Sequence, residues 1–315
     1  MTQRHYRKYE MKLIFVGTPP NAAIALERLS KTHEVVLVIT RTDAEVGRKR
    51  ELTASAVAAK AHELGLEVLK SNRLTLEHEQ QIRSAEADLA IVVAYGALIP
   101  VALLEVLPWW NLHFSLLPNW RGATPLQHSM LSGGVGSGVS LFRLDKGMDT
   151  GPLIAQRSVN INFEKTSGEL LEEFTVLGVD LMLEALEKPA IESTQTGDAT
   201  LAPKISRLDA RLNWSRSATE LMWQIMALNP EPGAWCVFED SPLKLLRARS
   251  LGAKDWNALG GTSLQPGFVE VKDGRVLVAC GEGSRLELVE VQPAGKKPMT
   301  AMEWARGAGV EISLA

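Results

Sequence analysis

From Lys12 onward the sequence repeats one pattern, in which a short apolar run rich in β-branched residues precedes a longer amphipathic stretch. The runs at Lys12–Gly17, Glu34–Ile39 and Asp88–Ala94 predict buried strands, and the stretches at Ala22–Leu29 and Thr53–Leu64 predict helices. Repeated strand–helix units of this kind predict an α/β fold with a parallel, doubly wound sheet. Ligands of such sheets bind beyond the carboxyl ends of the strands, so we expect the functional residues there.

The pattern changes near residue 188, which indicates that a second domain follows. The stretch from Lys188 to Pro203 is polar and contains Gly and Pro, as linkers do. Because 315 residues suffice for two domains, we predict a first domain over 11–188, a linker over 189–203 and a C-terminal domain over 204–315. The strand-like runs of the last part predict a small, OB-like β-barrel, and they lie at Ala234–Phe238, Leu243–Leu251, Gly267–Val271, Val276–Ala279 and Leu286–Val291.

Composition and charge narrow the class of protein. Apolar residues make up 45% of the chain, and no run approaches the roughly 18 apolar residues of a membrane span, which predicts a soluble protein without a membrane partner. Two cysteines outside any CxxC pair favour the reducing cytoplasm. The net charge is −3, and residues 200–315 carry 14 Lys and Arg against 13 Asp and Glu. A nucleic-acid partner would therefore need local basic clusters.

Several common catalytic patterns are missing from the sequence. Gly17-Thr18-Pro19 follows the first expected strand, where a dinucleotide-binding enzyme would carry GxGxxG. A P-loop, HExxH, GxSxG and a cluster of metal-ligand residues are also missing. We therefore expect neither a nicotinamide nor a nucleoside-triphosphate enzyme, and we expect no metal.

One dense polar stretch, from Asn111 to Gly122, remains as the candidate for chemistry. In a strand, Asn111 and His113 would project from the same face. An amide that donates to a developing oxyanion, beside an imidazole that accepts a proton, suits acyl transfer. Asp149 lies in a glycine-rich loop 36 residues after His113, and its carboxylate could fix the imidazole tautomer and raise the His113 pKa. The plainer interpretation is a structural His113 and a turn-forming Asp149.

Residues 12–300 carry eight segments that are typical of one family. They are FVGTP (Phe15–Pro19), VVAYGALIP (Val92–Pro100), NLHFSLLPNWRGATP (Asn111–Pro125), DKGMDTGPL (Asp145–Leu153), KIS (Lys204–Ser206), LNW (Leu212–Trp214), LNPEPGAW (Leu228–Trp235) and QPAGKKPM (Gln292–Met299). By these segments the chain resembles 10-formyltetrahydrofolate-dependent formyltransferases. The segments after residue 203 resemble the methionyl-tRNA formyltransferase family in particular.

The resemblance implies a Rossmann-like formyltransferase domain followed by a tRNA-binding domain. It implies an enzyme that transfers the formyl group of 10-formyltetrahydrofolate to the α-amino group of methionine on initiator tRNA, for translation initiation. By the resemblance Asn111, His113 and Asp149 are catalytic, and neither a metal nor a protein partner is required. The implied folate-contacting residues are Tyr95, Gly96, Ser115, Leu116, Leu117, Pro118 and Asp145.

The resemblance also implies two groups of tRNA contacts. The first is the loop Arg41–Leu52, which follows the second expected strand and contains three consecutive basic residues. The second lies in the C-terminal domain. Together the two groups comprise Arg48, Lys49, Arg50, Lys204, Arg207, Lys296 and Lys297.

Two other functions stay open from the sequence. A formyltransferase could act on another amine, such as glycinamide ribonucleotide or an amino-sugar nucleotide, although the extra β-rich domain disfavours the first of these acceptors. A binding module that holds folate or tRNA without turnover is also conceivable. The joint presence of Asn111, His113 and Asp149 argues against such a module.

Overall fold

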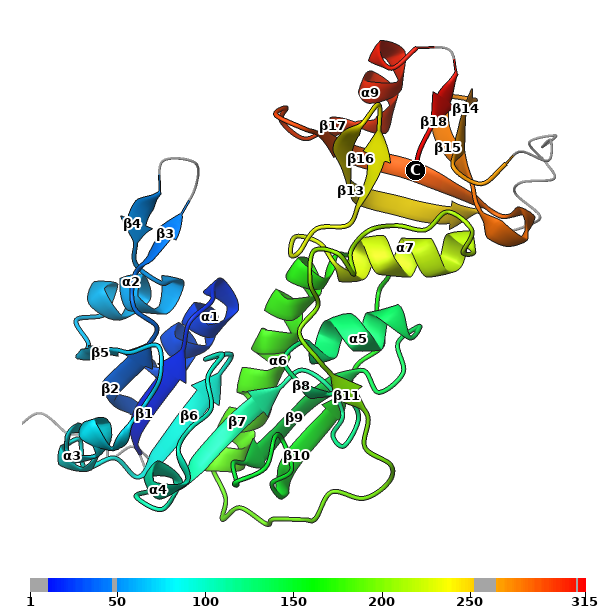
Figure 1. Cartoon of the computed structure of the whole chain (residues 1–315). Helices are drawn as coiled ribbons and strands as arrows, with labels where there is room; N and C mark the ends of the chain where they lie inside the picture. Colours follow the sequence, from blue (N-terminus) through cyan, green and yellow to red (C-terminus); the bar gives the residue numbers. More distant parts are fainter. Residues whose placement is uncertain (1–10, 47–49, 252–264, 310) are drawn as a thin grey trace, which may run out of the picture. The chain divides into compact units, whose positions relative to one another are not determined.

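The computed structural model describes residues 11–46, 50–251, 265–309 and 311–315. These residues form two compact units, each described here by itself (Figure 1). The first unit comprises the chain up to Pro125 together with Gly136–Val159 and Leu171–Ala202. The second comprises Leu126–Val135, Asn160–Leu170 and the chain from Pro203 onward.

A seven-stranded sheet forms the centre of the first unit. Its strands, in spatial order, are β10 (Leu153–Ser158), β9 (Gly138–Arg143), β7 (Trp109–His113), β6 (Leu89–Val93), β1 (Lys12–Gly17), β2 (Glu34–Thr40) and β5 (Val68–Lys70). The predicted α/β fold is confirmed, but the expectation of a wholly parallel sheet is wrong. The five strands from β7 to β5 are parallel, whereas β9 is antiparallel to both β7 and β10. The short connection between β9 and β10 accounts for the antiparallel pairing of these two strands, because a parallel pair needs a longer crossover.

Helices cover both faces of this sheet. On one face Ile14 and Val16 of β1 share a core cluster with Ile82 of α3 (Glu79–Ser84) and Leu103 of α4 (Val101–Leu104). Helix α6 (Ser167–Leu186) lies against the other face, where a Cβ on Gly178 would meet the Leu112 side chain at 2.6 Å. Helix α1 (Pro20–Leu29) lies beside α6, and the Asn21 side chain donates a hydrogen bond to the Thr175 hydroxyl of α6. The sheet is therefore doubly wound.

The segment after β2 differs in detail from the sequence-based expectation. Residues Ala44–Val46 (β3) and Glu51–Thr53 (β4) pair as a hairpin. The next helix, α2, spans Ala56–Glu63 and begins after Thr53, because the Ser55 hydroxyl caps it by accepting the Ala58 N–H. Of the three predicted basic residues, the structure describes Arg50, which directly precedes β4.

The first unit also contains a small two-stranded sheet, one strand of which follows β7 along the chain. Here β8 (Arg121–Gly122) pairs in parallel with β11 (Leu201–Ala202), and α5 (Pro125–Leu131) follows. The end of the segment predicted to be a linker therefore forms part of the first unit's hydrogen-bonded structure.

The second unit contains the predicted β-barrel, which is confirmed. Its strands, in spatial order, are β12 (Trp235–Phe238), β13 (Ser241–Leu251), β16 (Arg285–Pro293), β15 (Arg275–Ala279), β14 (Phe268–Lys272) and β18 (Ile312–Ser313), with β17 (Met299–Thr300) on β16. Backbone hydrogen bonds between Ala315 and Val237 of β12 bring the two edges together. Helix α7 (Ala218–Ala227) begins at a capping box of Ser217 and Glu220, and α9 (Ala301–Gly307) follows β17.

Candidate active site

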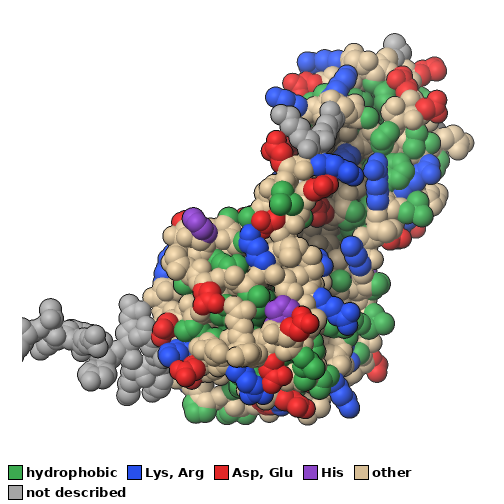
Figure 2. Space-filling model, turned by 60° about the vertical axis from the view of Figure 1, so that its left-hand side comes forward, with side chains coloured by type: hydrophobic (Ala, Val, Ile, Leu, Met, Phe, Trp, Pro, Cys, Tyr) green, Lys and Arg blue, Asp and Glu red, His purple; other side chains and the backbone are tan. Residues whose placement is uncertain are grey.

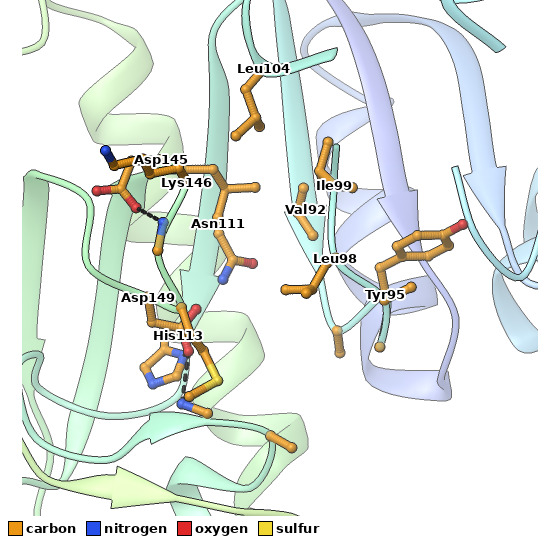
Figure 3. Close-up of a pocket in the computed structure, with 18 of the residues that line it drawn as sticks. Val92, Tyr95, Leu98, Ile99, Leu104, Asn111, His113, Asp145, Lys146 and Asp149 are labelled. Atoms are coloured by element: carbon orange, nitrogen blue, oxygen red, sulfur yellow. Dashed lines mark hydrogen bonds and ion pairs between the residues drawn. The ribbon is translucent and has the colours of Figure 1, made fainter. Parts of the chain in front are cut away.

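A cavity of about 770 Å³ opens at the carboxyl ends of β6 and β7 (Figure 3). Such a volume lies in the range of small-molecule and cofactor pockets. Most of its lining comes from four segments of the first unit: the connection from β6 to α4, the strand β7, the start of the α5 region and the connection from β9 to β10. Arg73, from the segment after β5, adds to it. Val92, Ile99 and Leu104 make one wall apolar, whereas Asn111, His113 and Asp149 provide a polar end. A flat heterocycle against the apolar wall would thus present a polar substituent to the three side chains.

Strand β7 places the two predicted catalytic side chains together. Asn111 and His113 are two residues apart on this strand, and both line the cavity. Figure 3 shows the Asn111 amide on the same side of the strand as the His113 ring. Asn111 is half-buried, whereas His113 is only 4% exposed.

The His113 ring is held from both of its nitrogen atoms. The Nε2 atom lies 2.9 Å from the Trp120 carbonyl oxygen, which can only accept, so Nε2 carries the proton. The Nδ1 atom faces Asp149 Oδ2 at 3.8 Å, too far for a hydrogen bond. The neutral ring therefore directs the lone pair of Nδ1 toward the carboxylate.

The Asp149 charge raises the His113 pKa, as expected, but burial of the ring has the larger and opposite effect. Burial of the imidazole lowers the His113 pKa below its usual 6.5, and this effect exceeds the opposing effects of the Asp149 charge and the Trp120 carbonyl. His113 is therefore neutral near pH 7 and can accept a proton.

Asp149 lies in the loop between β9 and β10. Asp149 has a φ of 54°, an unusual value for a residue other than Gly, and its Oδ2 accepts the Gly122 N–H at 2.8 Å. Asp145 shapes the loop, because its Oδ1 accepts the Gly147 N–H at 3.0 Å and the Thr150 hydroxyl at 2.7 Å. The loop thus fixes the carboxylate next to His113.

The predicted folate-contacting residues fall into two groups. Tyr95, Gly96 and Asp145 line the cavity. The Tyr95 ring points away from it, and the Tyr95 hydroxyl donates to the Ser71 carbonyl at 2.6 Å, so Tyr95 can offer a ligand mainly its backbone (Figure 3). The segment Ser115–Pro118, comprising Ser115, Leu116, Leu117 and Pro118, is not among the residues that line this cavity. The folate assignments stay predictions.

Most of the other lining residues were not predicted from the sequence, and Leu98, Met148, Arg73 and Lys146 are examples. Leu98 is 80% exposed and Met148 is 51% exposed, so both present apolar surface at the mouth of the cavity. Arg73 and Lys146 add positive charge to its lining. Leu98 and Met148 belong to segments that carry the family resemblance, so the signal was present, whereas nothing in the sequence singled out Arg73.

The predicted tRNA-contacting residues are widely spread. Arg48 and Lys49 lie outside the described residues. Arg50 lies next to them, with its Nε 3.4 Å from Glu45. Lys204, Arg207, Lys296 and Lys297 are exposed in the second unit. On the face shown in Figure 2, basic side chains are interspersed with acidic ones, as the near-neutral charge balance of the sequence predicts.

Trp235 of β12 forms a basic, aromatic cluster that the sequence did not predict. The guanidinium carbons of Arg207 and Arg211 lie 5.7 and 5.6 Å from the centre of its indole ring. The indole N–H donates to the Arg207 carbonyl at 2.8 Å. Cations at this distance from an aromatic ring are attracted by its quadrupole, which holds both guanidinium groups at one place. Only the fold reveals this cluster, because Trp235 is distant in sequence from the two arginines.

Metal-ligand clusters and membrane-spanning helices are both missing from the part of the chain that the structure describes. Among the described residues, no group of three or more His, Cys, Asp or Glu side chains is arranged to hold a metal ion. No helix within those residues combines the length and apolar character that crossing a membrane requires.

Solved structures confirm the fold. HypX from Aquifex aeolicus, in a complex with tetrahydrofolic acid, has a TM-score of 0.63 at 17% identity over 94% of this chain and 47% of its own. A methionyl-tRNA formyltransferase from Clostridium thermocellum has a TM-score of 0.56 at 17% identity, over 76% of this chain and 93% of its own.

Comparisons of sequence identify the family. The family described as "Formyl transferase" matches residues 11–186, and the family "Formyl transferase, C-terminal domain" matches residues 204–309. The methionyl-tRNA formyltransferase of Clavibacter sepedonicus is 43% identical over 94% of this chain and 97% of its own length. That of Leifsonia xyli subsp. xyli is 42% identical over 96% of this chain and all of its own. The cavity with its amide, imidazole and carboxylate therefore lies in a member of the formyltransferase family, and within that family the chain belongs to the methionyl-tRNA formyltransferases.

Proposed function

We propose that this chain transfers a formyl group from 10-formyltetrahydrofolate to the α-amino group of methionine on initiator tRNA, and that Asn111, His113 and Asp149 carry the reaction. One observation supports this assignment most: β7 and the β9–β10 loop bring these three side chains to one end of a cavity of about 770 Å³. The family membership supplies the substrates.

The lining of the cavity fits a folate. Its apolar wall, with Val92, Ile99 and Leu104, suits the flat face of a pterin, and the backbone of Tyr95 and Gly96 can provide hydrogen bonds to the pterin edge. When bound, 10-formyltetrahydrofolate supplies the formyl carbon, which leaves its N10 atom and joins the amine.

Asn111 and His113 can serve the two needs of formyl transfer. The Asn111 amide can donate a hydrogen bond to the formyl oxygen, on which negative charge develops during attack by the amine. The neutral His113 can accept, at Nδ1, a proton released by the attacking nitrogen. The same proton can then move to N10 of the leaving folate.

Asp149 supports His113 in this role. One oxygen of its carboxylate faces Nδ1 and is fixed by the Gly122 N–H. A proton taken up at Nδ1 would place the positive imidazolium next to this negative charge, so Asp149 stabilises the charged form that exists only during reaction.

We further propose that the catalytic domain spans residues 11–188, that a linker spans 189–203, and that the C-terminal domain, 204–315, binds tRNA. The cluster of Arg207 and Arg211 on Trp235 supports a contact with RNA, because guanidinium groups pair with phosphates and aromatic rings stack on bases. We expect the reaction to take place in the cytoplasm and to need no protein partner.

A formylation assay tests the proposal. The purified protein is incubated with 10-formyltetrahydrofolate carrying a labelled formyl group and with methionyl-initiator tRNA, and label in formyl-methionine is measured. Parallel reactions offer glycinamide ribonucleotide or an amino-sugar nucleotide as the acceptor. Transfer to methionyl-tRNA is the expected result, whereas transfer to another amine alone would overturn the assignment of the acceptor.

A further inference from the structure

The segment predicted to be a linker is tied to the loops of the active site. Ser193 exchanges two backbone hydrogen bonds with Leu153, at 2.8 and 2.9 Å. Further along, the Thr200 carbonyl accepts the Arg121 N–H at 2.9 Å, and the Thr200 hydroxyl accepts the Trp120 N–H at 2.8 Å. Trp120 is the residue whose carbonyl meets His113. The segment thus lies against the residues that hold the catalytic groups.

Within this segment, Gln195 contacts the catalytic loop directly. Its Nε2 donates to the Asp149 carbonyl at 2.9 Å and to the Gly151 carbonyl at 2.8 Å. Its Oε1 accepts from Nε and Nη2 of Arg121, at 3.1 and 2.7 Å. Both amide protons and both lone pairs of the oxygen are therefore used, which fixes the orientation of the amide.

Asp149 is a residue that needs such support. Its φ of 54° places it in the left-handed region, which residues other than Gly adopt uncommonly. Gln195 bonds the main chain at Asp149 and at Gly151, while Gly122 bonds the Asp149 side chain. The loop backbone and the carboxylate are thus fixed by separate contacts.

We infer that Gln195 is a positioning residue for formyl transfer, which holds the backbone of Asp149 so that the carboxylate faces His113. The inference rests on the proposed function and adds to it a residue from outside the predicted catalytic domain. Arg121 is its partner, because the guanidinium keeps the amide oxygen away from the two loop carbonyls.

The segment also has contacts that do not involve the Gln195 side chain. Gln195 is half-buried, and the pairing of β8 with β11 and of Ser193 with Leu153 uses backbone atoms only. Removal of the amide should therefore leave the unit folded while Asp149 moves out of alignment. Misplacement of a reacting group by about 1 Å can lower a rate by roughly 100-fold.

The test compares two variants with a matched control. Gln195→Ala removes all four hydrogen bonds, and Gln195→Glu keeps the oxygen that pairs with Arg121 but cannot donate to the loop carbonyls. Thr196→Ala changes an exposed neighbour in the same segment. We expect both Gln195 variants to lower kcat by roughly 10- to 100-fold, with KM for both substrates within about twofold of wild type and an unchanged melting temperature. The control variant Thr196→Ala should match wild type in kcat, KM and melting temperature.

A second readout does not require turnover. The pKa of His113 is followed by NMR through its ring Cε1–H signal, which is assigned by its absence in His113→Asn. Asp149 is the charged group that raises this pKa, so a displaced carboxylate should shift the titration of Gln195→Ala to lower pH than in wild type.

The outcomes separate the inference from the proposed function. The inference is overturned if both Gln195 variants keep the wild-type kcat and the wild-type His113 titration. It is also overturned if kcat falls together with the melting temperature while the His113 titration stays unchanged. An inactive wild-type protein in which Gln195→Ala still shifts the titration would overturn the proposed function and leave the positioning role supported.

Discussion

Among single residues, His113 illustrates a competition between burial and a neighbouring charge. The ring lies 3.8 Å from a carboxylate, yet burial lowers its pKa. The sequence indicated the pairing of His113 with Asp149, because the strand pattern and the glycine-rich loop were visible. It could not indicate the net shift, which depends on how much of the sheet and its neighbours covers the ring.

We expect the three catalytic substitutions to lower kcat strongly. His113→Ala removes the proton acceptor and Asn111→Ala removes the donor to the formyl oxygen, changes that typically cost about 10²–10⁴-fold and 10²–10³-fold respectively. Asp149→Asn removes the charge that stabilises the imidazolium. Steady-state kinetics should show reduced kcat with KM close to wild type. Wild-type turnover in His113→Ala would remove this residue from the mechanism.

The pH dependence follows from the direction of the His113 shift. The proposed mechanism uses the neutral imidazole, and a lowered His113 pKa keeps this form present to lower pH. We expect kcat/KM to fall on the acid side with a midpoint below pH 6.5, the usual value for His. A midpoint at or above 6.5 would indicate that the Asp149 charge outweighs burial in solution.

Among the elements, the positions of the strands were predicted better than the way in which the strands pair. The predicted strands over Lys12–Gly17 and Glu34–Ile39 agree with β1 and β2 of the structure, because apolar periodicity reports burial directly. The antiparallel direction of β9 and the existence of the short strands β17 and β18 were not predicted, since pairing direction and two-residue strands depend on distant parts of the chain. The role of Gln195 was not predicted either, because its hydrogen-bond partners are distant in sequence.

One ion pair ties the start of α6 to the barrel strand β13. Arg247 contacts Glu169 at 2.6 Å, and this hydrogen bond, with contacts from Thr166, lowers the pKa of Glu169 to about 2. A lowered folded-state pKa adds stability above the ordinary value of 4.5, and the contribution disappears as the pH falls toward 2. The pair is partly exposed, so we expect Glu169→Gln to destabilise the protein by less than about 1 kcal/mol at pH 7.

Urea denaturation of wild type and Glu169→Gln at a series of pH values checks this expectation. The difference in unfolding free energy should be present at pH 7 and shrink below pH 4.5. A difference that is independent of pH would show that packing, rather than the charge of Glu169, stabilises this contact.

For the whole molecule, the main prediction concerns recognition of tRNA. Removal of one phosphate contact should weaken the salt dependence of binding by roughly 0.7–0.9 in the slope of log K against log salt. We expect Arg207→Ala combined with Arg211→Ala to lower tRNA affinity and this slope, while formyl-donor binding stays unchanged. Arg306→Ala, an exposed cation on α9, is the matched control. Equal slopes in wild type and the double variant would place the RNA elsewhere.

The boundary between the two compact units crosses the chain at several points, not at one. Residues 126–135 and 160–170 belong with the barrel, where Phe163 packs against Trp223 at 5.7 Å between ring centres and a Cβ on Gly133 would meet the Trp223 ring at 2.7 Å. A chimera that takes only the residues after 203 from a relative would therefore set a foreign α7 against native partners. We therefore expect a chimera to be more stable when both short segments are transplanted together with the barrel, which a comparison of melting temperatures would check.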